Sequence, residues 1–285
     1  MKKSKTSADA DKPLVSIIIP TYNREKYILN AINSCLKQTY KNIEILVVDD
    51  CSTDKTKDLI KSINDKRIKY FRNETNRGAP YSRNFGLRIA RGEYINFLDD
   101  DDLLLPRKIE LQLKKFLASE DEKLGVVTCD VRFIRIDMDL TRKNRKKGNI
   151  YKDLLMKYCV YGTETMLIKK RCLEQIRGFD TKLQSDQEYD LAMRLARICH
   201  FDYVPETLTV KKMSTNQISF TYRKKIAGSI YFFRKHKQEF RKLGLKGYLF
   251  NVLRYYYSLA EYSLGLVFGR NASVFMEKLK QLFGI

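Results

Sequence analysis

The sequence predicts an α/β fold that begins as a parallel sheet, and two observations support this. Residues 14–19 and 43–48 are continuous apolar runs rich in β-branched side chains, which is typical of strands buried on both faces of a parallel sheet. Between them, residues 25–38 place their apolar side chains at helical spacing on one face. These three segments therefore predict a βαβ unit, from which folds of this class are built.

The alternation of strands and helices continues along the chain. A helix is expected after Ser52-Thr53-Asp54, because these side chains cap helices well. Further strands are expected at 68–72, 94–98, 124–130, 131–136 and 165–168. Further helices are expected at 79–90, 106–117, 150–158, 170–176 and 188–199. Because the alternation loosens after residue 130, we expect the sheet to become mixed there, and from residue 222 onward the pattern is helical.

Charge is unevenly distributed along the 285 residues. The formal net charge is +21, and residues 220–285 hold 13 Lys or Arg against 3 Asp or Glu. We expect a flexible tail at 1–12, an α/β domain at 13–219, and a basic, aromatic-rich helical region at 220–285. A balance this basic suggests an anionic partner such as a nucleotide, a nucleic acid or a membrane surface.

Cysteine usage and the apolar segments bear on location. The six cysteines show no C-x-x-C spacing, which predicts reduced thiols in a cytosolic protein. Residues 1–12 are polar and charged, so no secretory signal is expected. The longest weakly charged stretch, 255–269, is shorter than the roughly 20 apolar residues of a spanning helix. We therefore expect a cytoplasmic protein.

Four consecutive aspartates, Asp99 to Asp102, follow the predicted strand at 94–98. Adjacent carboxylates repel one another, so such a group is costly unless a cation or a ring of donors neutralises it. Mg²⁺ and Mn²⁺ prefer oxygen ligands and keep coordination places open for phosphates. The tetrad predicts either such a cation site or a solvated acidic turn that caps the next helix.

Polar residues also follow the first two strands. Residues 20–23 (PTYN) come after the first strand and residues 49–54 (DDCSTD) after the second. Ligands of open α/β sheets bind beyond the carboxyl ends of the strands, where these segments and the tetrad would form one rim. Three acidic or amide clusters on one rim exceed what loop capping requires, so we expect a binding site there.

Four motifs of the chain, three of which contain the rim residues, resemble those of glycosyltransferase family 2, in the family's order and spacing. They are residues 15–24 (VSIIIPTYNR), 47–54 (VVDDCSTD), 76–86 (NRGAPYSRNFG) and 92–102 (GEYINFLDDDD). The resemblance covers roughly residues 14 to 200. It implies a GT-A fold, here with a C-terminal helical extension, and an inverting transfer of sugar from a nucleotide-sugar, with a UDP-sugar as the expected donor.

The resemblance also implies roles for individual residues. A nucleotide pocket would be lined by Pro20, Thr21, Tyr22 and Asn23. Asp50 would hydrogen-bond the base, and Asp99 would face the ribose or the sugar. Arg83 would lie near the donor, although it could instead form an ion pair on the surface of a helix.

A metal ion is implied at the tetrad. Asp101, the third position of the family's D-x-D pattern, would coordinate Mn²⁺ or Mg²⁺, which would bridge the diphosphate oxygens. The middle position is more often small in the family, so Asp100 is a departure and leaves the choice among the four carboxylates open.

Inversion requires a single carboxylate that takes the proton of the acceptor hydroxyl. Relatives in the family carry this base as the second residue of a Glu-Asp pair before an aromatic-Asp-Leu segment. Here the pair is Gln187-Glu188, so the resemblance makes Glu188 the base, with Asp186 as its main competitor. In a purely structural interpretation, Asp186 caps the helix and Glu188 lies in its first turn, where the helix dipole favours acids.

The basic C-terminal region has two interpretations. Its Lys and Arg residues alternate with aromatic ones, which suits a surface helix on anionic lipid. The family resemblance implies a lipid-linked or other saccharide acceptor, so we expect such a helix at the inner face of the membrane. Equally, it could be a helical subdomain that packs on the core or on a second copy of the chain.

Two rival classes are less well supported. A nucleic-acid-binding protein is disfavoured, because an acidic rim repels phosphates and no such motif accompanies the charge. A nucleotidyltransferase that acts on sugar phosphates would need a Gly-rich phosphate loop near the first strand, which the sequence lacks. The sequence also lacks the His/Cys spacing of a zinc site. Residues 162–165 could form part of an acceptor wall, although a plain turn is the preferred interpretation.

Overall fold

The computed structural model describes residues 12–135, 138–212 and 222–268, and the chain divides into two compact units. The first unit contains the residues up to 150 together with 159–179 and 194–213. The second contains 151–158, 180–193 and the residues from 214 onward. Most of the expected tail at 1–12 and the expected boundary at 219/220 lie outside the described residues, and the two units are described separately below.

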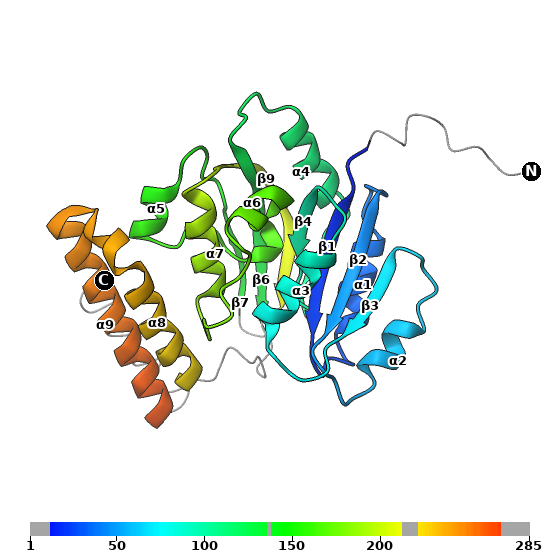
Figure 1. Ribbon diagram of the computed structural model, residues 1–285, viewed down its shortest axis with the longest axis horizontal. Coiled ribbons are helices and arrows are strands. Elements are labelled where there is room, and N and C mark those ends of the chain that lie inside the picture. Colours follow the sequence, from blue (N-terminus) through cyan, green and yellow to red (C-terminus); the bar gives the residue numbers. More distant parts are fainter. Residues whose placement is uncertain (1–11, 136–137, 213–221, 269–285) are drawn as a thin grey trace, which may run out of the picture. The chain divides into compact units, whose positions relative to one another are not determined.

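A single mixed sheet forms the centre of the first unit (Figure 1). Its path runs β3-β2-β1-β4-β8-β6-β9-β5, with β7 paired to β6. The strands are β1 Val15–Thr21, β2 Ile43–Asp49, β3 Ile68–Arg72, β4 Tyr94–Phe97, β5 Leu103–Leu104, β6 Leu124–Arg135, β7 Met138–Arg142, β8 Leu167–Lys169 and β9 His200–Lys212. Strands β1 to β4 are parallel, whereas β8 is antiparallel to both β4 and β6, so the expected change to a mixed sheet is confirmed.

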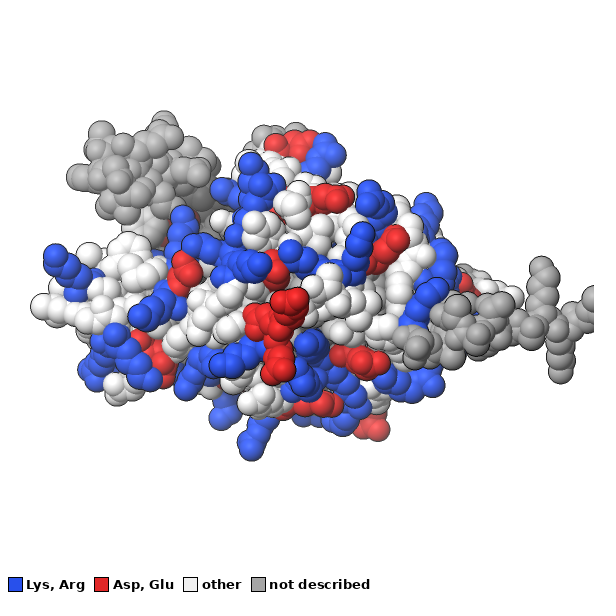
Figure 2. Space-filling view, turned by 90° about the horizontal axis from the view of Figure 1, so that it is seen from above, with Lys and Arg blue, Asp and Glu red and all other residues white. Residues whose placement is uncertain are grey.

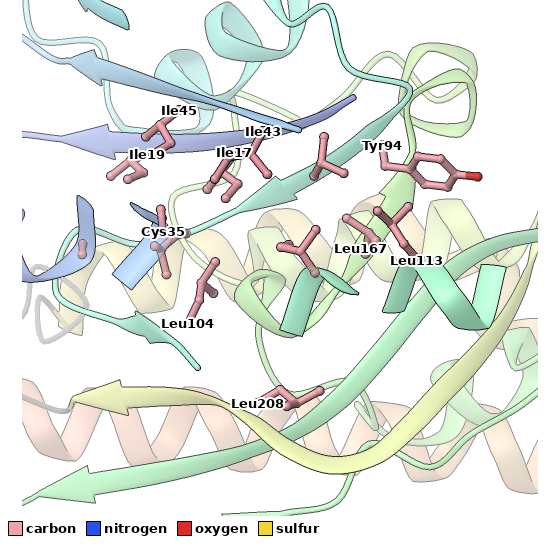
Figure 3. Packing of buried hydrophobic residues seen from close by; sticks show 14 of the residues in the cluster. Ile17, Ile19, Cys35, Ile43, Ile45, Tyr94, Leu104, Leu113, Leu167 and Leu208 are labelled. Atoms are coloured by element: carbon pink, nitrogen blue, oxygen red, sulfur yellow. The ribbon is translucent and has the colours of Figure 1, made fainter. Parts of the chain in front are cut away.

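Helices of the first unit cover this sheet. They are α1 Ile28–Leu36, α2 Thr56–Lys61, α3 Ala79–Ile89, α4 Lys108–Leu117 and α6 Lys170–Gln175, with a 3₁₀ turn, η2, at Thr163–Thr165. Side chains alternate along β1: Ile17 and Ile19 join the apolar cluster that includes residues of α1 and α4 (Figure 3). Ile18 contacts Gly86 of α3, where no Cβ could fit. Both faces of β1 are therefore buried, as its continuous apolar run predicts.

The described part of the second unit is mainly helical. It contains α5 Tyr151–Met156, the first part of α7 Gln187–Ala196, and the long helices α8 Tyr222–Arg241 and α9 Gly244–Phe268. A turn with Gly244 at φ 76° joins α8 to α9, and the two helices lie side by side, with the Phe233 and Tyr255 rings stacked 4.4 Å apart (Figure 1). None of the helices in the described residues is both long and apolar enough to cross a membrane.

Three strands were not expected from the sequence. Strands β5 and β7 are short, and polar residues alternate with apolar ones along most of β7. The long strand β9 contains Pro205 and several charges, which argue against a buried strand. Its pairing with β6 steps from Val204 directly to Thr207, so Pro205 and Glu206 lie in a bulge, where a proline does no harm to the ladder.

Glu44 of β2 is a buried acid that fixes one corner of the sheet. Its carboxylate accepts hydrogen bonds from the Ser16 hydroxyl (2.7 Å), the Arg91 backbone N–H (2.7 Å) and Lys69 Nζ (2.8 Å). Burial disfavours the charged form, but these donors outweigh it and hold the pKa of Glu44 at about 2.

The ionised form of Glu44 should therefore stabilise the fold. We expect Glu44→Gln to lower the free energy of unfolding at pH 7 by about 1–3 kcal/mol, because buried donors lose a charged acceptor. Since the folded pKa lies below the ordinary value of 4.5, this contribution is fully present above that value and is lost as the pH falls toward 2. Urea denaturation at pH 7, 5 and 3.5 tests this, with the exposed Glu93→Gln as control. A difference that stays constant over this range would contradict the assignment.

Candidate functional site

The carboxyl ends of β1, β2 and β4 meet at one edge of the sheet in the first unit. Thr21 pairs with Asp49, and the Asp50 N–H donates to the Thr21 carbonyl at 2.8 Å. Arg24, which follows β1, forms ion pairs with Asp100 (3.2 Å) and Asp101 (3.8 Å), which follow β4. The polar segments after β1, β2 and β4 therefore form one rim, as the sequence pattern predicts.

Basic side chains neutralise the aspartate tetrad in part. Besides the pairs of Arg24, Arg83 Nη2 lies 2.6 Å from Asp99 Oδ1. Lys211, near the end of β9, places its Nζ 3.7 Å from Asp99 Oδ2 and 3.6 Å from Asp102 Oδ2. The ion pairs give each of the four carboxyl groups a cation within 4 Å, which lowers the repulsion that the sequence implies.

A fifth carboxyl group belongs to this set. Glu164, in the turn η2, is fully buried, and its Oε1 lies 3.4 Å from the same Lys211 ammonium. We call Asp99 to Asp102 together with Glu164 the acidic cluster. Sequence reasoning missed Glu164, for which only a plain turn was expected, and Lys211, because β9 was not recognised. Arg24 was part of a quoted motif but was given no role.

The aspartates of the acidic cluster differ in acidity. For Asp99, burial favours the neutral form, but Arg83, Lys211 and Arg24 prevail and hold its pKa at about 2. Burial raises the pKa of Asp100 to about 7, despite Arg24. Burial also raises the pKa of Asp101, with the charge of Asp99 adding to the shift, and the pKa of Asp102, against the effect of Lys211. The tetrad thus combines a strongly ionised carboxylate with groups that would ionise more readily beside an added cation.

The interpretation of the tetrad as a solvated helix cap is wrong. The N-cap residue of α4 is Arg107, and no side chain forms a capping hydrogen bond there. Asp100 and Asp102 are only 7% and 0% exposed. In addition, Asp102 Oδ1 accepts the backbone N–H of Lys212 at 3.0 Å, and Asp102 Oδ2 has no hydrogen-bond partner among the described residues. A buried carboxylate oxygen of this kind fits a bound cation.

Asp50 fastens the loop between β3 and α3. Its two carboxylate oxygens accept hydrogen bonds from Asn73 Nδ2 (2.7 Å) and from the backbone N–H groups of Arg77 (2.9 Å) and Gly78 (2.6 Å). Gly78 has φ 86°, which lets the backbone turn toward the carboxylate. The predicted contact between Asp50 and a base would have to share an oxygen with these donors, and it stays a prediction.

The segment predicted to line a nucleotide pocket lies where β1 ends. Pro20 and Thr21 are buried in the strand, and Tyr22 is half-buried. Asn23 has φ 51°, accepts the Thr53 N–H at 2.8 Å through its side chain, and donates its own N–H to the Ser52 hydroxyl at 2.9 Å. The loops after β1 and β2 are therefore joined, although their contact with a nucleotide stays a prediction.

Arg83 is buried rather than exposed. Only 5% of the residue is accessible, and its guanidinium lies 5.2 Å from the centre of the Phe179 ring while it pairs with Asp99. The alternative of an ion pair on a helix surface is therefore wrong: Arg83 does form an ion pair, but it is buried. A position near a donor sugar remains a prediction.

The two candidate bases belong to the second unit. Glu188 lies in the first turn of α7 and is half-buried. Asp186 precedes the helix with φ 59°, and its Oδ2 accepts hydrogen bonds from the hydroxyls of Ser185 (3.0 Å) and Ser229 (3.3 Å). Burial raises the pKa of Asp186. The carboxylate of Asp186 is thus already held by local donors.

Comparison with known proteins identifies the relatives of this chain. Residues 16–174 match the model of glycosyl transferase family 2. WcaA of Escherichia coli, a glycosyl transferase with a provisional assignment to colanic acid biosynthesis, is 31% identical over 85% of this chain and 88% of its own length. An uncharacterised glycosyltransferase of Methanocaldococcus jannaschii is also 31% identical, over 89% of both chains.

Solved structures share the fold. TarS 1–349 of S. aureus in complex with UDP-GlcNAc superposes with a TM-score of 0.62 at 21% identity, over 90% of this chain and 74% of that one. The mannosyltransferase PcManGT of Pyrobaculum calidifontis, in complex with GDP-Man and Mn²⁺, gives a TM-score of 0.60 at 20% identity, over 95% and 80%. At these identities the likeness concerns the fold alone.

Proposed function

The chain belongs to glycosyl transferase family 2 and has the GT-A fold, and from this premise we propose a donor, an acceptor and a mechanism. The enzyme transfers a sugar from a nucleotide-diphospho-sugar, a UDP-sugar, to a saccharide or lipid-linked acceptor with inversion. Its product belongs to a cell-surface polysaccharide or other glycan. The UDP-GlcNAc bound to TarS supports the donor class, and the assignment of WcaA supports the pathway. The observation that carries the proposal is the acidic cluster at the carboxyl ends of the strands.

A divalent cation, Mn²⁺ or Mg²⁺, would complete the proposed site. Asp101 would hold it, and the buried Asp102 Oδ2, which has no hydrogen-bond partner among the described residues, is a second candidate oxygen. When bound, the ion acts as a Lewis acid that neutralises the diphosphate leaving group. Hard oxygen ligands of this kind suit either ion. The Mn²⁺ in the PcManGT complex supports the proposal of a divalent cation. Arg24, Arg83 and Lys211 pair with the surrounding carboxylates and limit their mutual repulsion.

The acceptor hydroxyl loses its proton to Glu188 in this proposal. Its position in the first turn of α7 agrees with the alignment on Tyr189-Asp190-Leu191. Asp186 is the weaker candidate, because its Oδ2 already accepts two hydroxyl hydrogen bonds. A carboxylate at the start of a helix is also well oriented for proton transfer, since the first turn fixes its backbone.

Donor binding tests the proposal most directly. We expect calorimetric titration with UDP-, GDP-, dTDP- and CDP-sugars to show binding of UDP-sugars that Mn²⁺ tightens by about tenfold or more, because a bound cation would offset the negative charge of the diphosphate. Slow hydrolysis of the same donor should release UDP. The nucleotidyltransferase alternative would instead produce pyrophosphate from UTP and a sugar phosphate. Absence of binding and hydrolysis for every donor, with and without metal, would overturn the proposal.

We further propose that the enzyme associates with the inner face of the membrane through α9. One face of this helix exposes large apolar side chains at intervals of three and four residues: Leu245, Leu249, Leu253 and Tyr256, with Phe250 beside them. Leu245 and Leu253 are 74% and 69% exposed. The hairpin of α8 and α9 is rich in Lys and Arg. Lys and Arg side chains are also numerous on the side of the molecule that Figure 2 shows. Basic residues next to exposed apolar ones suit an anionic lipid surface.

Sedimentation with lipid vesicles tests the membrane proposal. We expect the protein to bind vesicles that contain phosphatidylglycerol more tightly than neutral ones. The double substitution Leu249→Ser with Leu253→Ser should weaken binding by about tenfold, because two exposed leucines that would enter the lipid are lost. The control is Leu117→Ser, which removes a leucine that is 67% exposed in the first unit. Equal recovery of the wild type and the double variant in the supernatant would contradict the proposal. If the wild type is a dimer that the double variant dissociates, the face instead joins two copies of the chain.

A further inference from the structure

The segment that leads into α7 lies directly against α8 within the second unit. Ser185 contacts Gly228 so closely that a Cβ at residue 228 would lie 2.5 Å from the Ser185 backbone nitrogen. The Ser185 hydroxyl also lies 3.4 Å from the Lys225 carbonyl. One residue later, Asp186 accepts a hydrogen bond from Ser229. Gly228 and Ser229 therefore fix the point at which the chain enters α7.

An ion-pair network around the buried Asp190 holds the other end of the first turn. Asp190 is fully buried, and its Oδ1 lies 2.7 Å from Lys235 Nζ and 2.8 Å from His236 Nε2. Lys235 also lies 2.6 Å from Asp180 Oδ2, and Tyr231 donates to the same carboxylate at 3.2 Å. A carboxylate buried in this way keeps its position only while its partners keep theirs.

Aromatic contacts of Tyr189 also hold the first turn of α7. The Tyr189 ring packs on Phe232 of α8, with 4.8 Å between the ring centres, and on Tyr158 at 4.9 Å. Its hydroxyl donates to the Leu154 carbonyl and accepts a hydrogen bond from Arg254 of α9 at 3.2 Å. Residues 185, 186, 189 and 190 are thus all held by the two C-terminal helices or by α5, and Glu188 lies between them in the chain.

We infer that the C-terminal helical hairpin is a positioning element for the proposed base, with Gly228, Lys235 and His236 as its positioning residues. The inference rests on the proposed role of Glu188. General-base catalysis needs the carboxylate within hydrogen-bond reach of the acceptor hydroxyl, and a shift of about 1 Å can cost about a hundredfold in rate. The hairpin supplies this precision to the first turn of α7, while the proposed metal ligand and nucleotide contacts belong to the first unit.

Gly228→Ala in the full-length enzyme tests the inference. The new methyl group must displace Ser185, so we expect kcat to fall by about tenfold or more while the UDP affinity in Mn²⁺ stays within about twofold. The control is Ala227→Gly at the neighbouring, exposed position, which weakens the helix without contact to Ser185 and should keep kcat within about twofold. If Gly228→Ala does not fold, Lys235→Met takes its place, with Lys237→Met as its control.

A double-mutant cycle separates positioning from general destabilisation. In a Glu188→Gln background, Gly228→Ala should cause no further loss of transfer, because the group that it displaces no longer acts as a base. The inference is overturned if the folded Gly228→Ala enzyme keeps the wild-type kcat, or if its effect is equally large in both backgrounds. Near-normal transfer by Glu188→Gln alone would instead refute the proposed base, so the two failures are distinguishable.

Discussion

Replacing Glu188 with Gln should lower kcat by about 10²- to 10⁴-fold, which is the usual contribution of a general base. The amide keeps the size and the hydrogen-bonding shape of the side chain but cannot take the acceptor proton. The affinity for UDP in the presence of Mn²⁺ should stay within about twofold, because Glu188 has no proposed contact with the donor nucleotide. Initial rates with an active donor and acceptor, together with calorimetric titration of UDP, measure both quantities.

The matched control for this substitution is Asp186→Asn. The serine hydroxyls around Asp186 can also donate to an amide oxygen, so we expect a smaller loss than for Glu188→Gln. Glu188→Asp should restore part of the activity, because the carboxylate returns at a shorter reach. A Glu188→Gln enzyme with near-normal transfer, beside an inactive Asp186→Asn enzyme, would move the base to Asp186.

Asp101→Asn should abolish the effect of Mn²⁺ on donor binding and lower transfer by about 10²- to 10³-fold. A metal ion supplies several kcal/mol of charge stabilisation to a diphosphate leaving group, and each 1.36 kcal/mol corresponds to about tenfold in rate. An amide oxygen is a far weaker ligand for a hard cation than a carboxylate. Titration of Mn²⁺ by electron paramagnetic resonance reads the loss without any turnover.

Two further variants complete the test of Asp101. Asp139→Asn removes an exposed aspartate that pairs with Arg132 on the first unit, and it should leave Mn²⁺ binding unchanged. Asp102→Asn examines the buried neighbour, the duty of which the sequence leaves open. Unaltered Mn²⁺ affinity in Asp101→Asn, with a loss in Asp102→Asn, would transfer the ligand role to Asp102.

The parallel half of the sheet could be predicted from local pattern because its signals are local. The pattern within about ten residues is enough to predict a strand for the apolar run 43–48 and an amphipathic helix for α1. Strand β9 could not be predicted in this way. Its ladder depends on partners far away in the sequence, and Pro205 is harmless only because the pairing with β6 is bulged at that residue.

For the candidate site too, the sequence predicts the features that depend on local pattern but not those that depend on long-range contacts. Carboxylates at strand ends follow from the order of elements, so Asp50 and the tetrad could be placed on one rim. Their partners could not, because Lys211 and Glu164 reach the acidic cluster through pairing that only the folded chain defines. The contacts of Asp50 with residues 73–78 and those of Asp190 with α8 are also long-range packing facts. A sequence motif shows that a carboxylate is present, but not what already surrounds it.

The ion pairs of the acidic cluster carry a consequence for stability. In these pairs, three cations, Arg24, Arg83 and Lys211, face five carboxyl groups. Four of the carboxyl groups are mostly or fully buried. Packing so many acids together works against folding, and a chain under selection for stability alone would replace some of them with apolar residues. The fold therefore gives up stability at this edge of the sheet to keep a place for positive charge, and any cation that binds there returns part of it.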